Sequence, residues 1–422
     1  SSEKMASSVM RIGICGGGVV GGGVYSILSA KATSVCEVVK VCVRDLTKKR
    51  DWVKPGTELV DNWEAVVQDD SIQLVIEVMG GVDAAKDCVY EALRRGKHVV
   101  TANKALLATH MDEILSLRQQ RSSLGFEAAV CGGIPIIATL QQHMLHDEIK
   151  SVRGIMNGTT NFMLTKMEGG ADYGEVLAEA QALGFAEADP TADVEGLDVQ
   201  AKIAILAKLA FGKTVAPSDV PAVGISAIEA VDFEYANLLD STIRLLGTAS
   251  SSDNKISVFV YPHVVKRDHA SGFASARGPA NAVALVSEQL GVASLVGAGA
   301  GRFPTARSVV ADVMRICSGS SSSVPFPVAG TPALSPDFTS AFYVRVSARD
   351  QLGIIKDLGA AAQSRGVSIN AVLQNPIKDP ANIAFVVTTD PVPLSSVTAF
   401  ANDVAALPFA LKKPLVLAIL DD

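Results

Sequence analysis

The sequence has no uninterrupted apolar run of about 18 residues, the length that a membrane-spanning helix needs. Residues 1–8 also lack the apolar centre of a secretory signal peptide. We therefore expect a soluble cytoplasmic protein that has no membrane partner. The start of the chain is rich in serine and has no initiating methionine, which is compatible with a cleaved transit peptide. The plastid stroma is therefore the alternative location.

Basic runs and cysteine motifs are also absent. The 37 basic residues are outnumbered by 44 acidic ones, so a nucleic acid is not expected as the main partner. Six cysteines stand apart, without CxxC pairs or the spacing of metal ligands, which argues against a disulfide framework or a zinc site. With 48% apolar and 19% charged residues, a chain of 422 residues predicts a globular protein of about two to three domains.

The first part of the chain alternates short β-branched runs with amphipathic stretches. Strands and helices are expected in turn, with strands at 10–15, 37–43, 74–78 and 98–101 and helices at 24–30 and 84–95. Repeated β-α-β order predicts an α/β fold in which residues 9–150 form a Rossmann-type, doubly wound sheet that binds a dinucleotide.

The rest of the chain predicts further segments. Residues 151–304 mix longer helices with strands and predict an α+β domain for catalysis and dimerisation, and residues 305–317 are expected to pack back on the first domain. Residues 318–340 are rich in serine and proline and predict a surface linker. Residues 341–422 alternate in a way that predicts a small βαββαβ module.

The turn after the first expected strand carries the pattern G-x-G-x-x-G. Gly16 allows the tight turn, Gly18 lets a pyrophosphate approach the backbone, and Gly21 permits close helix packing. Val19 and Val20 lie between them at the start of the helix, where unpaired N–H groups favour an anion. The strand–turn–helix context favours a bound dinucleotide over a glycine-rich turn without a ligand.

The end of the second expected strand bears on which dinucleotide is bound. Asp45 alone would accept the ribose hydroxyls of NAD, but Arg44 precedes it and Lys48, Lys49 and Arg50 follow. A guanidinium at this point can neutralise a 2′-phosphate, so NADP is favoured and NAD stays possible.

Polar residues of the middle of the chain predict a catalytic site. Lys104 directly follows a strand, at the sheet edge where ligands of open α/β folds bind, and Glu187 lies on a turn. Asp198 and Lys202 are four residues apart and share a helix face. An exposed ion pair is the plain alternative, but Ile205 continues the stripe, so we expect the pair to point inward. A desolvated lysine suits proton donation during carbonyl reduction by hydride.

Together these segments resemble homoserine dehydrogenase of the monofunctional type. The resemblance lies in 102–104 (Ala-Asn-Lys), 154–161 (Gly-Ile-Met-Asn-Gly-Thr-Thr-Asn), 184–202, 299–301 (Gly-Ala-Gly) and 304–305 (Pro-Thr), over roughly residues 9–317. It implies reversible reduction of L-aspartate 4-semialdehyde to L-homoserine with NADPH or NADH, in the biosynthesis of threonine, methionine and isoleucine. By resemblance, Lys202 is the proton donor, Glu187, Asp198 and Thr159 bind substrate, and Lys104 and Gly301 serve the cofactor side.

The resemblance also implies a sodium ion, held mainly by backbone carbonyls of a loop. The matching stretch is 127–135, and the ligands carried over are Glu127, Val130, Gly132 and Ile134. A merely structural turn is the alternative. This chain departs from the family in having Phe185 where a tyrosine is frequent and a bulky pair, Arg302 and Phe303, after the glycines. Neither departure removes a charged catalytic group.

The module at 341–422 resembles an ACT domain, a small amino-acid-binding regulator. The stretch 350–353 (Asp-Gln-Leu-Gly) lies between its first strand and helix, where such domains contact an effector, and threonine is the expected effector. The alternative is a module that only pairs sheets with another subunit in a homo-oligomer, a dimer or tetramer. Truncation after Ser318 is expected to remove amino-acid inhibition and to spare catalysis.

Two rival functions stay open. An acylating semialdehyde dehydrogenase would use Cys131, on the loop at 130–132, as a thiol nucleophile. A non-catalytic NADP-binding protein would instead report amino-acid levels through its C-terminal module. Substitution of Cys131 by serine and an assay of NADPH oxidation separate these functions from direct hydride transfer.

Overall fold

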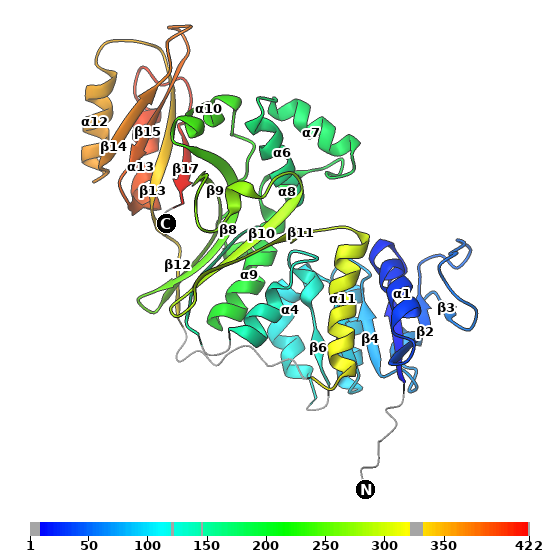
Figure 1. Cartoon of the computed structure of the whole chain (residues 1–422). Coiled ribbons are helices and arrows are strands. Elements are labelled where there is room, and N and C mark those ends of the chain that lie inside the picture. The colour runs from blue at the N-terminus through cyan, green and yellow to red at the C-terminus, as the bar shows by residue number, and fades with distance from the viewer. Residues whose placement is uncertain (1–8, 120–121, 145–146, 321–331, 421–422) are drawn as a thin grey trace. The chain divides into compact units, whose positions relative to one another are not determined.

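The computed structural model describes residues 9–119, 122–144, 147–320 and 332–420, so the serine-rich start at 1–8 lies outside the described residues. The chain divides into two compact units (Figure 1). The first consists of Ser1–Ile149, Ala204–Asp219 and Leu295–Thr331, and the second of Lys150–Ile203, Val220–Ser294 and Pro332–Asp422. Within the described ranges, no helix is long and apolar enough to cross a membrane.

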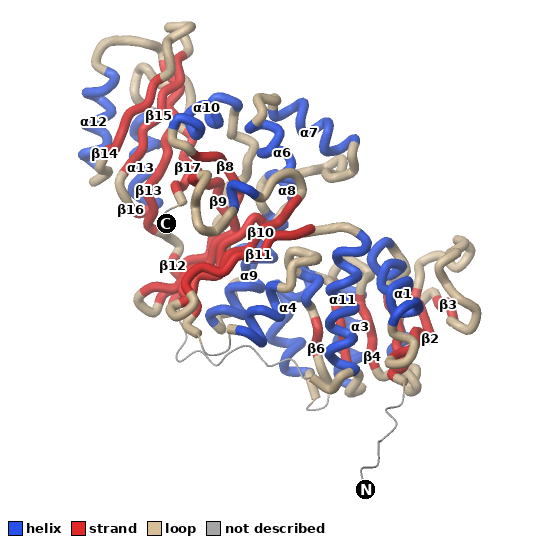
Figure 2. Tube along the Cα trace, viewed as in Figure 1, coloured by secondary structure: helices blue, strands red, loops and turns tan. Residues whose placement is uncertain are grey.

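Six parallel strands form the sheet of the first unit, in the order β3-β2-β1-β4-β5-β6. The strand order reverses between β1 and β4, and ligands of such sheets bind outside the carboxyl ends of the strands at that point. The predicted α/β fold with a Rossmann-type sheet is confirmed (Figure 2). Its elements are β1 Met10–Cys15, α1 Val19–Lys31, β2 Cys36–Cys42, β3 Glu58–Val60, α2 Glu64–Val67, β4 Leu74–Glu77, α3 Asp83–Arg94, β5 His98–Thr101, α4 Lys104–Leu117, β6 Leu124–Gly125, the 3₁₀ turn Glu127–Ala129, α5 Ile136–Ala138 and the π-helical turn Thr139–His143.

Helix α11 (Arg302–Cys317) returns to this sheet from late in the chain. Ala306, Val309 and Val313 belong to the same buried apolar cluster as Ile12 of β1 and Val24 of α1. These three positions recur at intervals of three and four residues, so one face of α11 is apolar. One face of residues 305–317 therefore packs into the core of the first unit.

The second unit is built on an eleven-stranded sheet. Nine strands follow the order β11-β10-β7-β8-β9-β17-β13-β15-β14, while β12 pairs with β9 and β16 with β13. In chain order, the elements from β7 to β11 are β7 Ile149–Ile155, α6 Gly158–Glu168, α7 Tyr173–Ala182, α8 Thr191–Val194, α9 Leu197–Phe211, the 3₁₀ turn Pro217–Asp219, α10 Ala230–Leu238, β8 Ser241–Ser252, β9 Lys255–Lys266, the 3₁₀ turn Phe273–Ser275, β10 Ala280–Ser287 and β11 Gly291–Ala298. Of these, the turn Pro217–Asp219 belongs to the first unit. Helix α9 and strand β11 run across the boundaries of the two units.

The C-terminal segment continues this sheet. Its elements are β12 Ala333–Ser335, β13 Thr339–Ala348, α12 Ile354–Ser364, β14 Ile369–Gln374, β15 Ile383–Thr389, β16 Val392–Pro393, α13 Leu394–Ala405 and β17 Leu415–Ile419. Apart from the short strands β12 and β16, this is the expected βαββαβ order. Strand β17 pairs in parallel with β9 and antiparallel with β13. Phe342 and Phe400 share a buried cluster with Phe259 and Tyr261 of β9, so this segment and β9 have one core.

The segment at 318–340 differs from the expected surface linker. Residues 321–331 lie outside the described residues. After them, β12 pairs in parallel with β9, and the ring of Phe338 stacks on that of Phe259 at a centroid distance of 3.7 Å. The second half of the segment is therefore packed against the sheet. The sequence did not reveal this packing, because serine and proline dominate the segment and the strand is only three residues long, too short to show alternation.

Candidate active site

Lys202 occupies the middle of α9 and points inward. Its Nζ donates hydrogen bonds to the Met156 carbonyl oxygen at 2.6 Å and to Asp198 Oδ2 at 2.7 Å. The two charged side chains are 10% and 8% exposed. The predicted inward orientation of this pair is therefore what the structure has. Its geometry follows from the spacing of four residues on one helix.

Asn157 holds the Asp198 carboxylate from a second element. As the N-cap of α6, Asn157 accepts a hydrogen bond from Thr160 N through Oδ1, which fixes its amide. Its Nδ2 then donates to Asp198 Oδ2 at 2.9 Å and to Asp193 Oδ1 of α8 at 2.7 Å. Asp198 thus accepts from both a buried ammonium and a buried amide, so its position is set by three elements.

Asn157 and Asp193 belong to this cluster, and the sequence alone did not point to either of them. The signal for Asn157 was its place in the stretch at 154–161, just before a helix, where asparagine is a frequent cap. Asp193 gave no such signal, since its contact with Asn157 joins residues 36 positions apart.

Glu187 lies on the loop that follows α7, and Thr159 of α6 contacts this loop. Thr159 Oγ1 donates a hydrogen bond to the Phe185 carbonyl oxygen at 2.6 Å, and the Phe185 ring lies 5.0 Å from that of Phe162. These contacts hold the loop against α6. Glu187 is exposed on it, with its carbonyl oxygen accepting from Gln181 Nε2. The structure thus brings Lys202, Asp198 and Asn157 together, while the Glu187 side chain faces solvent.

The glycine loop of the first unit has the geometry of a phosphate cradle. Gly16 has φ +116°, and a Cβ there would lie 2.4 Å from the Val78 carbonyl oxygen. A Cβ at Gly21 would lie 1.8 Å from the Gly16 carbonyl oxygen, whereas one at Gly18 would meet open space. Gly18 is the N-cap of α1 and offers no side-chain cap, so the helix N–H groups are left for an anion. Val19 opens the helix and Val20 follows.

A buried carboxylate, Glu77, organises the neighbouring strand ends and was not predicted. It accepts hydrogen bonds from Met79 N at 2.8 Å and from Thr101 Oγ1 at 2.6 Å. Burial raises its pKa above the ordinary value, although these donors oppose the shift. Asn103 donates to the Gly81 carbonyl oxygen at 2.6 Å and caps α4, which Lys104 begins. Lys104 is therefore half-buried at the carboxyl edge of the sheet.

The loop after β2 leaves Arg44 exposed and engages Asp45 in a turn. Asp45 Oδ1 accepts from Thr47 N at 2.8 Å and from Thr47 Oγ1 at 2.6 Å, which lowers its pKa. Arg50 Nη1 donates to the carbonyl oxygens of Asp45 and Lys48, both at 2.8 Å. The loop is thus held in place with one guanidinium, Arg44, exposed at its start.

The loop expected to hold sodium contains one fitting carboxylate. Glu127 is buried, and its two carboxylate oxygens accept from Ile137 N at 2.9 Å and Ala138 N at 2.7 Å. Burial and the neighbouring carboxylate of Asp312 raise its pKa to about 7. A desolvated carboxylate beside a second one favours a cation nearby. No group of three or more His, Cys, Asp or Glu side chains suited to a metal occurs in the described ranges, so carbonyl oxygens would have to supply the other ligands.

The backbone carbonyl groups that the resemblance names as sodium ligands differ in their surroundings. Cys131 and Gly132 both have positive φ, 53° and 47°, so the backbone turns sharply at this point. The Ile134 carbonyl oxygen already accepts from Ile136 N at 2.9 Å. A Cβ at Gly132 would lie 2.4 Å from the Gly299 carbonyl oxygen, so this loop packs on the loop that leads to Gly301, the N-cap of α11. Glu127, Val130 and Gly132 therefore fit a cation site better than Ile134.

Cys131 is buried, with 1% of its surface exposed. A thiol nucleophile must meet its substrate, and reactive cysteines lie in partly exposed, electropositive surroundings. This burial argues against the acylating rival.

Comparison with known proteins places these features in one family. The family model described as "Homoserine dehydrogenase, NAD binding domain" matches residues 16–129, and the model "Homoserine dehydrogenase" matches residues 135–314. Homoserine dehydrogenase of the Synechocystis strain PCC 6803 is 40% identical over 404 residues, which cover 90% of this chain and 93% of the relative.

Solved structures agree with this placement. A homoserine dehydrogenase from Thiobacillus denitrificans has a TM-score of 0.90 and 34% identity, and the match covers 98% of this chain and 99% of that one. A hyperthermophilic archaeal homoserine dehydrogenase, solved in complex with NADPH, has a TM-score of 0.61 and 26% identity over 72% of this chain and 97% of its own. The chain belongs to the homoserine dehydrogenase family, and it is an NAD(P)-dependent oxidoreductase that acts on a CH–OH group.

Proposed function

We propose that the chain reduces L-aspartate 4-semialdehyde reversibly to L-homoserine, with Lys202 as the proton donor. The observation that carries this role is the Nζ of Lys202, buried on α9 and held between the Met156 carbonyl oxygen and Asp198. When bound, NAD(P)H supplies a hydride to the aldehyde carbon. As the C–O double bond becomes single, the oxygen gains negative charge, and Lys202 gives it the proton that completes the alcohol. Lys202 then regains a proton from solvent.

Neighbouring residues position this ammonium. Asp198 and Asn157 fix the rotamer of Lys202, which keeps the donor in one place while charge develops on the oxygen. Glu187, exposed and anionic, suits the amino group of the substrate. Thr159 holds the loop that carries Glu187, since its hydroxyl donates to the Phe185 carbonyl oxygen. Its part in substrate binding is therefore indirect.

The cofactor side is assigned to the first unit. The phosphate cradle consists of Gly16, Gly18 and Gly21 with Val19 and Val20. The binding site of the same cofactor also includes Gly301 and Lys104. Exposed Arg44 favours NADP over NAD, because the Asp45 carboxylate is already engaged by Thr47. A sodium ion would be held by Glu127, Val130 and Gly132, with Ile134 the weakest of the four carried ligands; it would order the loop and take no part in proton or hydride transfer.

The C-terminal module is proposed to bind an effector. Gly353 has φ +94° as the N-cap of α12, and Leu352 is fully exposed beside it, so the loop at 350–353 is accessible. Threonine is the proposed effector and a homo-oligomer the proposed assembly. The ACT-type assignment of this module, the expected domain boundaries and the cell compartment stay predictions.

The decisive experiment measures NADPH oxidation by the purified full chain with L-aspartate 4-semialdehyde. Turnover together with formation of L-homoserine supports the proposal. NADPH binding without turnover would favour the sensor. The Cys131→Ser variant tests the acylating rival: near-normal turnover excludes a thiol intermediate, whereas lost turnover in a folded variant would contradict direct hydride transfer.

A further inference from the structure

A polar cavity lies in the unit that carries Lys202 and shares none of the side chains of the Lys202 cluster. It has a volume of about 490 Å³ and lies between the end of α6, helix α10 and the strands β8 and β9. Cavities of this size hold small organic ligands. The charged and amide side chains that line it are Glu168, Glu234, Asn237, Arg267 and Arg277.

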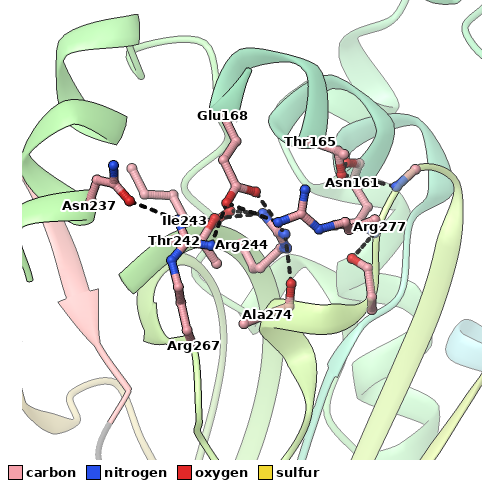
Figure 3. Close-up of polar contacts among 12 residues, drawn as sticks. Asn161, Thr165, Glu168, Asn237, Thr242, Ile243, Arg244, Arg267, Ala274 and Arg277 are labelled. Atoms are coloured by element: carbon pink, nitrogen blue, oxygen red, sulfur yellow. Dashed lines mark hydrogen bonds and ion pairs between the residues drawn. The ribbon is translucent and has the colours of Figure 1, made fainter. Parts of the chain in front are cut away.

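Three guanidinium groups surround the carboxylate of Glu168, which lines this cavity (Figure 3). Glu168 lies 3.2 Å from Arg244 Nη2, 2.9 Å from Arg267 Nη1 and 3.5 Å from Arg277 Nη2. Burial would raise the pKa of Glu168, but the arginines outweigh it and lower that pKa. Asp240 also lies 3.9 Å from Arg267 Nε, so three arginines face two carboxylates and the cluster keeps a surplus of positive charge, part of it on Arg244, which is fully buried.

The donors of Arg267 and Arg277 are placed to meet a ligand. Arg267 Nη2 donates to Asn237 Oδ1 at 3.0 Å, which fixes its guanidinium at the cavity wall. Arg277 is 58% exposed and meets Glu168 only at the limit of a hydrogen bond. A guanidinium carries five N–H donors in a planar fork, so both arginines retain donor capacity for a carboxylate.

The α10 side of the cavity supplies the complementary charge. Glu234 is an exposed residue of α10, and its Oε2 accepts from Asn375 Nδ2 at 3.0 Å. In the part of the chain that the structure describes, Glu234 forms no ion pair with an arginine or a lysine. A ligand with a carboxylate toward the arginines and an ammonium toward Glu234 would satisfy both walls. This is the charge pattern of a free α-amino acid.

We infer that this cavity binds a small zwitterionic amino acid, with its carboxylate on Arg267 and Arg277 and its ammonium facing Glu234. The site is separate from the Lys202 cluster and from the loop at 350–353. Helix α10 connects it to the C-terminal segment, because Asp232 and Tyr235 of this helix contact Arg345 and the Ala384 carbonyl oxygen. Helix α6 connects it to Asn157, which caps the other end of that helix.

Equilibrium dialysis of the full chain with radiolabelled L-alanine tests the inference. We expect saturable binding that weakens roughly tenfold or more in Arg277→Ala, since hydrogen bonds to a charged group are lost. Arg277→Lys should recover little, because an ammonium lacks the fork. Arg365→Ala, which removes an exposed ion-paired arginine elsewhere on the same unit, should bind like the wild type.

Three further comparisons assign the binding to this cavity. Unlabelled propionate and ethylammonium should compete far less well than unlabelled L-alanine, because each satisfies one wall only. Glu234→Gln should weaken alanine binding. Lys202→Met and Asp350→Asn should leave it unchanged. No saturable binding, or equal binding by Arg277→Ala, overturns the inference; equal competition by propionate, or wild-type affinity in Glu234→Gln, overturns the zwitterion assignment.

Discussion

A single buried ammonium is the group on which the proposed chemistry depends. We expect Lys202→Ala to lower kcat roughly 100-fold or more, the range of general acid catalysis, and to leave the Kd for NADPH nearly unchanged. The reason is that Lys202 lies with Asp198 and Met156 and not in the glycine loop. Steady-state rates and a fluorescence titration of NADPH measure the two effects. Lys208→Ala, on the same helix but paired with Asp112, is the matched control. Equal loss of turnover and NADPH affinity in Lys202→Ala would contradict the assigned role.

The carboxylate beside this lysine has a different test. Asp198→Asn keeps the shape of the side chain but removes the negative charge that lies 2.7 Å from the buried Lys202 Nζ. We expect kcat to fall about tenfold and the free energy of unfolding to fall by about 1–3 kcal/mol, since a hydrogen-bonding group remains. Urea unfolding and initial rates measure both. An unchanged kcat would show that Asp198 does not position the donor.

What the sequence could predict at this scale depended on distance along the chain. Asp198 and Lys202 lie four residues apart, so helix geometry alone placed them together. Asn157 meets Asp198 across 41 positions, and Glu77 meets Thr101 across 24. Those contacts exist only after the sheets have formed, so no local pattern revealed them. The family resemblance supplied roles for Glu187 and Thr159. Only the structure shows that the Thr159 hydroxyl donates its hydrogen bond to the Phe185 carbonyl oxygen.

At the scale of elements, a buried ion pair joins α10 to β13. Arg345 Nε donates to Asp232 Oδ1 at 2.7 Å, and Tyr343 Oη donates to the same oxygen at 2.8 Å. Removing one partner leaves a buried charge unpaired, so Arg345→Met should lower the free energy of unfolding by about 3–5 kcal/mol. Urea unfolding measures the loss.

The double variant Asp232→Leu with Arg345→Met is the matching comparison for this pair. It removes both charges and should be more stable than Arg345→Met alone, because no unpaired charge remains. The exposed pair Arg365–Asp403 provides the control, where Asp403→Ala should leave the free energy of unfolding nearly unchanged. A double variant no more stable than the single one would show that packing and not charge dominates at this contact.

Strand β9 carries a histidine whose burial predicts a pH dependence. His263 is buried, its Nδ1 lies 2.8 Å from the Tyr261 carbonyl oxygen, and burial lowers its pKa to about 4, with Arg153 adding to the shift. The unfolded chain therefore binds the proton more readily between pH 6.5 and about 4, so the folded state loses stability as pH falls through this window. The loss is up to about 3 kcal/mol.

Urea unfolding between pH 4 and 7 checks this sign. His263→Asn keeps a side-chain N–H for the Tyr261 carbonyl oxygen but cannot titrate, so its stability should depend less steeply on pH in that window. An equal slope in both proteins would mean that other groups set the acid sensitivity.

Element boundaries were predictable where local pattern decided them. The strand predicted at 98–101 has the bounds of β5, and the helix predicted at 84–95 differs from α3 by one residue at each end. Helix α1 instead begins at Val19, five residues before the expected start, because three consecutive glycines at 21–23 hid it. Packing explains the glycines: a Cβ on Gly23 would lie 3.0 Å from the Ala306 Cβ of α11. Tertiary contact thus overrides a low helix propensity.

At the scale of the whole molecule, the C-terminal segment is part of a shared core. Phe259 and Tyr261 of β9 are 6% and 8% exposed, and both belong to the cluster that contains Phe342 and Phe400. Composition suggested a module on a linker, which could be removed without cost. A strand pairing between β9 and β17, residues far apart in sequence, makes it a continuation of the sheet instead.

Truncation after Ser318 is therefore expected to cost stability as well as any amino-acid inhibition. It removes α12, α13 and the strands β12 to β17, leaves Phe259 and Tyr261 without their apolar cover and opens the edge of β9. We expect Tm to fall on the order of 5–10 °C and the truncated protein to aggregate, because an uncovered strand pairs with other chains. Differential scanning calorimetry and size-exclusion chromatography measure both effects.

A truncated form that also carries Phe259→Thr and Tyr261→Thr should aggregate less, since threonine keeps the β propensity of these positions and removes their apolar surface. A truncated protein with the Tm, solubility and kcat of the full chain would show that the segment is an independent module after all.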